Sequence, residues 1–224
     1  GFQMNKPPMK LVDALKRAVD GRSEFENATV TDKLGAALPT RRPFDSAVAP
    51  GFAAVGDAAA HVNPATGGGI PGAAKAGHWA ANVAMDAIAS GDVSEAALWK
   101  YNEMVMQDFG KRFAAIDLYN VWSGTHTVSA LTDIVTALPG QALVDALAGD
   151  AAGMSLGLKV KTLLGTFGHW GTLYELYKVH KAATDLRTVY ESYPSDPAAF
   201  DGWRERRDEI YERVYDISGA EPKY

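Results

Sequence analysis

The residues best suited to chemistry lie in one stretch from Gly51 to Gly77, which reads GFAAVGDAAAHVNPATGGGIPGAAKAG. A short apolar run there ends in Gly56-Asp57 and reads as a strand. Asp57 would then sit at the carboxyl edge of a sheet, where open α/β sheets bind ligands. Its carboxylate can accept hydrogen bonds from a sugar-type hydroxyl, and Gly56 allows a ligand or another backbone to approach closely.

The same stretch ends in three glycines, Gly67 to Gly69, at the expected start of an Ala-rich helix. Pro71 suits the first turn of that helix, where its missing N–H costs nothing. Bare N–H groups and the positive end of the helix dipole would face a site that can hold negative charge. A reduced flavin carries such charge on its N1–C2=O edge. The alternative is a plain turn followed by a flexible loop, but the whole succession of features favours a ligand site.

Two phosphate-binding motifs fit this stretch poorly. Gly67, Gly69 and Gly72 match G-x-G-x-x-G, but the dinucleotide fingerprint must follow a strand immediately. Here a loop that begins at Gly56 separates the strand from the glycines. The phosphate loop also fails, because no Gly-Lys pair follows Gly51 and Gly56.

The segment GDAAAHVNPATGGGI resembles the second flavin-binding motif of the geranylgeranyl reductase family, whose pattern is similar to GDAAGxVNPxTGGGI. That family belongs to the flavoproteins shaped like para-hydroxybenzoate hydroxylase. The match is tight over about 25 residues and looser in the flanks LVDALKRAV and LWKYNEMVMQDFGKRF. Ala60 stands where the family often has Gly, which tightens the loop.

The resemblance implies FAD as the cofactor. It implies that Asp57 contacts the ribityl chain beside Gly56, and that Pro64 and the run Gly67, Gly68, Gly69 and Ile70 line the isoalloxazine ring. No catalytic residue is assigned. The family's amino-terminal GxGxxG unit does not occur in these residues. We therefore expect the chain to be the carboxy-terminal half of a longer protein and to bind FAD poorly, or not at all, alone.

The expected fold is α/β and mainly helical in this chain. Residues 1–91 would form the carboxy-terminal part of a Rossmann-like FAD-binding domain, and residues 92–224 an all-helical region. Periodicity predicts helices from Leu11 to Gly21, from Pro71 to Ser90, from Glu95 to Asn120 and from Pro197 to Ile217. Strands are predicted at 28–38 and at 51–55. Breaks are expected at Pro139-Gly140, Gly149, Gly165 and Pro194.

The function implied by the resemblance is an FAD-dependent reductase that saturates isoprenoid (geranylgeranyl) double bonds of archaeal membrane lipids. Its partners would be an isoprenoid lipid and a reduced electron donor, NAD(P)H or ferredoxin. The alternatives are an aromatic monooxygenase or halogenase of the same fold, and a non-catalytic helical lipid-binding module that kept a degenerate flavin loop.

The segment 153–181 is rich in Leu and aromatic residues and carries four lysines against one glutamate. Such a stretch can rest on a membrane surface, although a packed core helix looks similar. We assign Leu163, Phe167 and Trp170 to the lipid substrate. The expected location is cytoplasmic, with peripheral contact at a membrane as the alternative.

Composition excludes several function classes. The net charge of -5 argues against a nucleic-acid partner, and the absence of cysteine removes disulfides and thiolate chemistry. None of the five histidines has the spacing of a metal site. His61 is expected to pack the loop, with flavin contact as the alternative. Arg41-Arg42 are expected in a solvated loop, with a phosphate contact as the alternative.

Overall fold

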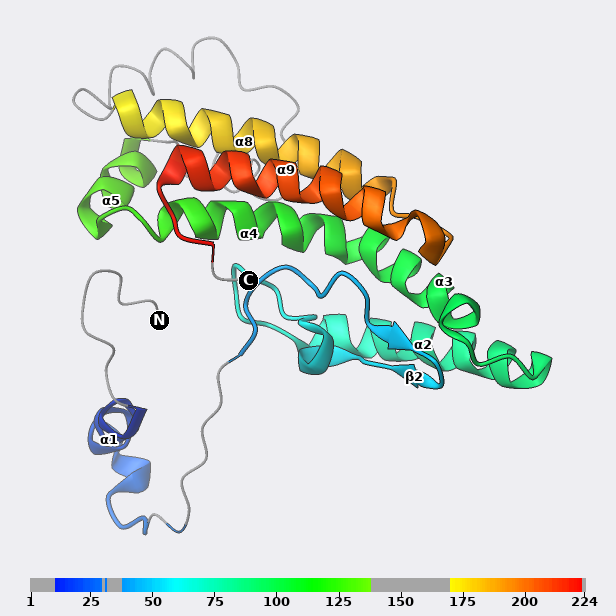
Figure 1. Cartoon of the computed structure of the whole chain (residues 1–224). Coiled ribbons are helices and arrows are strands. Elements are labelled where there is room, and N and C mark those ends of the chain that lie inside the picture. Colours follow the sequence, from blue (N-terminus) through cyan, green and yellow to red (C-terminus); the bar gives the residue numbers. More distant parts are fainter. Residues whose placement is uncertain (1–10, 30, 32–37, 138–169, 223–224) are drawn as a thin grey trace. The chain divides into compact units, whose positions relative to one another are not determined.

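The computed structural model describes residues 11–29, 31, 38–137 and 170–222 (Figure 1). The chain divides into two compact units, Gly1–Ala37 and Leu38–Tyr224. In the first unit, helix α1 (Leu11–Asp20) is followed by a 3₁₀ turn at Ser23–Phe25. The helix predicted from Leu11 to Gly21 is confirmed. The strand predicted at 28–38 falls mostly outside the described residues, and the described ones among them form no strand.

The second unit begins with a small antiparallel hairpin. Strand β1 (Val48–Ala49) pairs with β2 (Phe52–Ala53), so that Val48 lies opposite Ala53. The strand predicted at 51–55 is therefore shorter than expected. An apolar run of this kind is typical of a buried strand, but 58% of Phe52 is exposed. In the described chain β1 is the only strand that pairs with β2.

Two helices follow the hairpin at the predicted places. Helix α2 (Ile70–Ser90) has Pro71 in its first turn and ends at Gly91, whose φ of 74° suits a glycine cap. Helix α3 (Glu95–Val105) begins after Ser94, whose side chain accepts a hydrogen bond from the Ala97 N–H. The end of α2 and the start of α3 both agree with the sequence-based prediction.

A π-helical turn, Met106–Gly110, joins α3 to helix α4 (Lys111–Ser123). One uninterrupted helix was predicted here. Gly110 suits the wider turn because a Cβ on it would lie 3.0 Å from the Val105 carbonyl oxygen and 3.1 Å from the Met106 sulfur. π-turns inside α-helices are rare and occur frequently at functional sites.

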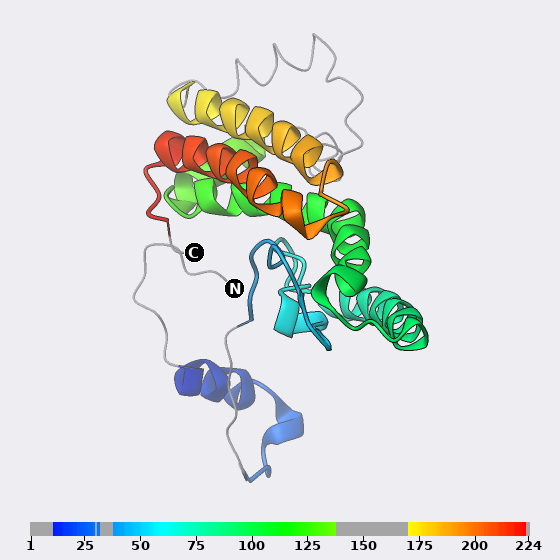
Figure 2. The same ribbon diagram turned by 45° about the vertical axis from the view of Figure 1, so that its right-hand side comes forward.

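The remaining described helices are α5 (Val128–Ala137), α8 (Trp170–Glu191) and α9 (Phe200–Ser218), the last preceded by a 3₁₀ turn at Pro197–Ala199. Helices α4, α8 and α9 lie side by side in both views (Figures 1 and 2). The break predicted at Pro194 is confirmed. Those at Pro139-Gly140, Gly149 and Gly165 lie outside the described residues. No helix in the described ranges is both long and apolar enough to span a bilayer.

Hydrogen bonds tie α3 to the hairpin and to the helices. The Tyr101 hydroxyl donates to the Ala54 carbonyl at 2.8 Å, and the Trp99 indole N–H donates to the Pro194 carbonyl at 2.7 Å. The domain boundary predicted at residue 91 therefore lies inside one compact unit. As a division of function it stays a prediction, as does the Rossmann-like domain, because the described sheet has only two strands.

Candidate functional site

Gly56 begins the candidate flavin loop, residues 56–69, three residues after the end of β2. Its φ of +64° favours glycine, and a Cβ there would lie 3.3 Å from the Ala73 Cβ on α2. Gly56 is buried, whereas Asp57 is exposed in the 3₁₀ turn Gly56–Ala59. Asp57 follows the last residue of β2 by four positions, and β2 belongs to an antiparallel hairpin. Its place at the carboxyl edge of an open α/β sheet stays a prediction.

His61 fixes the shape of the loop from inside. Its Nδ1 accepts the Gly56 N–H at 3.2 Å, and its own backbone N–H donates to the Gly56 carbonyl at 3.0 Å. The side chain is 1% exposed, and its ring lies edge-on to Phe109 at a centroid distance of 5.2 Å. Burial lowers the pKa of His61 to about 4, so the ring is neutral at pH 7. The loop-packing interpretation of His61 is confirmed.

The second half of the loop is closed on Asn63. The Asn63 N–H donates to the Gly68 carbonyl at 3.0 Å, and its own carbonyl accepts the Gly67 N–H at 2.9 Å. Pro64 is buried, and its carbonyl accepts a hydrogen bond at 3.0 Å from the Asn120 side-chain amide on α4. The loop is thus held both internally and by the helical part of the chain.

The loop delivers a glycine-rich helix start to the surface. Gly69 is the N-cap of α2 and no side chain caps it, so the N–H groups of the first turn lack an intrahelical partner. Gly67 and Gly68 are exposed, as is 85% of Ile70. A Cβ on Gly69 would lie 3.1 Å from an Asp57 carboxylate oxygen. The Asp57 carboxylate, which can accept a hydrogen bond from a hydroxyl, therefore lies next to the positive end of the α2 dipole.

Comparison with known proteins gives several archaeal relatives that share one name. No protein-family model matches the chain. The digeranylgeranylglycerophospholipid reductase of Sulfolobus acidocaldarius is 26% identical over 191 residues, which cover 84% of this chain and 42% of that protein. The reductase 1 of the same name from Methanococcoides burtonii is 39% identical over 92 residues, 41% of this chain and 22% of that protein. The reductase of Methanothrix thermoacetophila is 36% identical over 107 residues, 48% of this chain and 26% of that protein.

The chain is similar in sequence to these digeranylgeranylglycerophospholipid reductases, a similarity that supports the geranylgeranyl reductase family. The matches fall in the carboxy-terminal part of these archaeal relatives, and the chain spans less than half the length of each of the three. The resemblance inferred from the GDAAAHVNPATGGGI segment is thereby confirmed.

Gly72, one glycine of the G-x-G-x-x-G match, has a packing role. A Cβ on Gly72 would lie 2.6 Å from the His61 carbonyl oxygen, so Gly72 lets α2 rest directly on the loop backbone. Gly69 lies close to the Asp57 side chain, whereas Gly67 is exposed and its φ of +71° favours glycine. The described residues also contain no group of three or more histidine and acidic side chains that could hold a metal ion.

The residues assigned to the substrate cannot be placed in the same way. Leu163 and Phe167 lie outside the described residues. Trp170 is the first residue of α8, and its side chain also falls outside the described part. Their contact with the lipid stays a prediction.

A charge network that was not predicted anchors residues 41–45 to the helices. Arg41 Nε lies 2.5 Å from a carboxylate oxygen of Asp117, which is fully buried, and the Tyr211 hydroxyl donates to its other oxygen at 3.0 Å. Arg207, 2% exposed, contacts Asp45 at 2.6 Å. Burial, reinforced by the Asp117 charge, raises the pKa of Tyr211 well above its usual value, so its hydroxyl stays a donor.

This network corrects the expectation that Arg41-Arg42 occupy a solvated loop. Both arginines are half-buried, and the Arg42 guanidinium lies 4.6 Å from the centroid of the Tyr211 ring. A lone aspartate within the apolar run FAAIDLYNVW was the available signal. A buried carboxylate needs a cationic or hydrogen-bonding partner, and the paired arginines upstream supply one.

Proposed function

We propose that this chain is the carboxy-terminal portion of an FAD-dependent reductase that saturates isoprenoid double bonds of archaeal lipids. The observation that carries the proposal is the uncapped start of α2 at Gly69, with the Asp57 carboxylate beside it. The names of the relatives support a reductase of digeranylgeranylglycerophospholipid rather than a monooxygenase or a halogenase.

The residues present fit a flavin on physical grounds. Asp57 is exposed and can accept hydrogen bonds from ribityl hydroxyls, as the position of a carboxylate at a loop edge allows. Gly67 and Gly68 offer backbone without side chains, and Ile70 offers an exposed apolar side chain to a flat ring. Pro64 positions this wall through its bond to Asn120. We choose FAD because the N–H donors at the start of α2 match the anionic N1–C2=O edge of a reduced flavin.

When bound, FAD supplies the hydride that reduces a carbon–carbon double bond. The chain's own contribution is to orient the ring and to stabilise negative charge. The first turn of α2 points its N–H groups and its positive dipole end to the loop side, which favours the reduced cofactor by about 0.3–1 kcal/mol. The buried His61, which is neutral at pH 7, keeps the loop in the shape that presents Asp57.

The substrate would be an isoprenoid lipid, reduced with electrons from NAD(P)H or ferredoxin. We further propose a cytoplasmic protein with peripheral contact at the membrane, since its substrate class resides there. The segment 153–181, with Leu163, Phe167 and Trp170, would supply apolar surface for the chain of the lipid, because each buried CH₂ contributes about 0.8 kcal/mol.

The decisive experiment uses the full-length protein. Visible absorption of the purified protein should show bound flavin, and anaerobic reduction followed by addition of a geranylgeranyl lipid should reoxidise it with a saturated product in mass spectrometry. A colourless protein that FAD does not reconstitute would refute the flavin assignment and favour the non-catalytic lipid-binding module. A yellow protein that hydroxylates or halogenates an aromatic compound, and leaves the lipid unchanged, would refute the reductase.

A further inference from the structure

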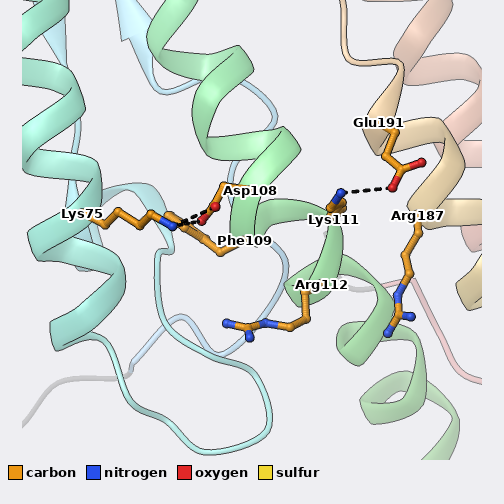
Figure 3. A pocket seen from close by; sticks show the side chains of 7 residues that line it. All are labelled: Lys75, Asp108, Phe109, Lys111, Arg112, Arg187 and Glu191. Atoms are coloured by element: carbon orange, nitrogen blue, oxygen red, sulfur yellow. Dashed lines mark hydrogen bonds and ion pairs between the residues drawn. The ribbon is translucent and has the colours of Figure 1, made fainter. Parts of the chain in front are cut away.

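A basic pocket of about 430 Å³ opens between α2, the π-helical turn with the start of α4, and α8. Figure 3 shows the side chains that line it. They are Lys75, Asp108, Phe109, Lys111, Arg112, Arg187 and Glu191. The volume lies within the range of small-molecule sites, about 300–1,000 Å³. None of these residues belongs to the candidate flavin loop.

The pocket carries more positive charge than its own carboxylates neutralise. Lys75 contacts both oxygens of Asp108 at 2.7 and 2.6 Å. Lys111 contacts Glu191 at 3.0 Å. Four cationic and two anionic side chains leave a balance of 4 - 2 = +2, in a chain whose net charge is -5.

Arg112 and Arg187 account for the excess. Neither forms an ion pair with a described residue; the Arg112 guanidinium rests 5.6 Å from the centroid of the Phe113 ring. Figure 3 shows both guanidinium groups on the same side of the Lys111–Glu191 ion pair, with Arg112 on α4 and Arg187 on α8. Two separate helices thus bring unpaired guanidinium groups to one opening.

The π-helical turn shapes this site. It places Asp108 and Phe109 just before the cations Lys111 and Arg112, so that all four reach the pocket. Phe109 is 5% exposed and its ring stacks on Trp79 at a centroid distance of 6.2 Å. The pocket therefore combines a fixed aromatic group with cations, which is the composition of a site for an organic anion.

We propose that this pocket binds the phosphate group of a phosphate ester, with Arg112 and Arg187 contacting the phosphate oxygens. Guanidinium groups match phosphate oxygens in a bidentate way, and a monoester carries about -1.5 to -2 charge near neutral pH. This charge complements the balance of the lining better than a single carboxylate does. Phe109 would contact the organic part of the ester. The site does not depend on flavin binding.

Calorimetric titration of the full-length, flavin-loaded protein tests the proposal with three probes. Glycerol phosphate represents a soluble ester and short-chain phosphatidic acid a lipid ester; short-chain phosphatidylcholine is the zwitterionic control. We expect the first or second probe to bind and the third to bind at least about tenfold more weakly. Tighter binding of phosphatidic acid than of glycerol phosphate identifies a lipid headgroup, and equal binding identifies a soluble ester.

Variants locate the binding. Arg112→Glu with Arg187→Glu should weaken binding at least about tenfold. Arg206→Glu, the same charge change on the exposed face of α9, should leave it unchanged. Glu191→Gln frees Lys111 and should tighten binding a few-fold, a gain that misfolding cannot produce. The proposal is overturned if no phosphate probe binds the wild type, if all three variants bind alike, or if Glu191→Gln gives no gain while Arg206→Glu weakens binding.

Discussion

Gly56 and His61 exchange two hydrogen bonds: the Gly56 N–H donates to the His61 ring at 3.2 Å, and the His61 N–H donates to the Gly56 carbonyl at 3.0 Å. The ring bond requires an unprotonated Nδ1. Because the ring is also buried, the shape of the flavin loop is linked to the protonation of one side chain.

The first prediction concerns stability and pH. Burial lowers the pKa of His61 to about 4 in the folded protein, against about 6.5 when unfolded. As pH falls, the unfolded chain binds the proton before the folded chain does. The contribution of His61 to the free energy of unfolding is therefore fully present above about pH 6.5 and is lost toward pH 4, by about 3 kcal/mol at most. Urea unfolding at pH 7 and pH 5 measures this loss. His61→Gln should be less stable at pH 7 and should show a smaller loss; an identical loss would assign it to other groups.

The second prediction concerns FAD retention. Asp57→Ala in the full-length protein removes an exposed acceptor next to the start of α2, and should weaken FAD binding by about 1–3 kcal/mol. Asp86→Ala, an exposed aspartate further along α2, is the control and should retain the cofactor. Flavin content after dialysis at low micromolar protein measures the difference. Full occupancy in Asp57→Ala would remove this residue from the cofactor site.

The third prediction concerns the reduced cofactor. Gly68→Ala puts a methyl group 3.3 Å from the Thr66 hydroxyl, on the exposed part of the loop. We expect it to hold the ring away from the start of α2 and to lower the midpoint potential by about 10–20 mV, the equivalent of about 0.5–1 kcal/mol for two electrons. Gly171→Ala, whose Cβ meets nothing within 4 Å, should leave the potential unchanged. Equal potentials with normal FAD content would argue against this role of the loop.

The fourth prediction compares two helix glycines. Gly110→Ala places a methyl group 3.0 Å from the Val105 carbonyl oxygen and should destabilise the protein by about 1–3 kcal/mol. Gly77→Ala meets nothing within 4 Å in the middle of α2, and should stabilise it by about 0.4–1 kcal/mol. The denaturant midpoints of both variants show whether each substitution stabilises or destabilises the protein. A neutral or stabilising Gly110→Ala would show that the π-helical turn accepts a side chain.

The fifth prediction concerns the buried network. Asp117→Ala removes the carboxylate that both Arg41 and Tyr211 contact, and should cost about 3–5 kcal/mol because charged and polar groups stay buried. Asp185→Ala breaks the exposed pair with Arg213, 3.1 Å apart, and should cost under about 1 kcal/mol. Thermal unfolding separates the two. Similar small losses would mean that Asp117 is not important for stability.

The sequence predicted the elements whose determinants are local. Ser94 and Gly91 mark helix ends through their own side chain or backbone, and Pro71 marks a helix start. A strand followed by a turn at Gly56-Asp57 was also predicted, because a Gly-Asp pair after an apolar run is a local signal. The motif then led to the family that the comparisons confirm.

Features that depend on distant residues were not predicted. The pairing of Arg41 with Asp117 joins positions 76 apart in sequence, and no local pattern of Arg-Arg distinguishes such a pair from a solvated loop. The basic pocket unites α2, α4 and α8 for the same reason. The π-helical turn was not predicted because its hydrogen bonds span one residue more than those of an α-helix over a single turn, a difference that hydrophobic spacing does not resolve.

The turn at Met106–Gly110 makes the number of residues between α3 and α4 matter as much as their identity. Because its hydrogen bonds run from i to i+5, the turn accommodates one residue more than an α-helix would, so deleting one residue there would give a continuous α-helix that keeps the orientation of α4. Deleting two residues would instead rotate every later position by about 100°, and Phe113 and Leu118, buried among the helices now, would face away from their neighbours. Deletion of two residues between Val105 and Lys111 should therefore be tolerated far less well than deletion of one.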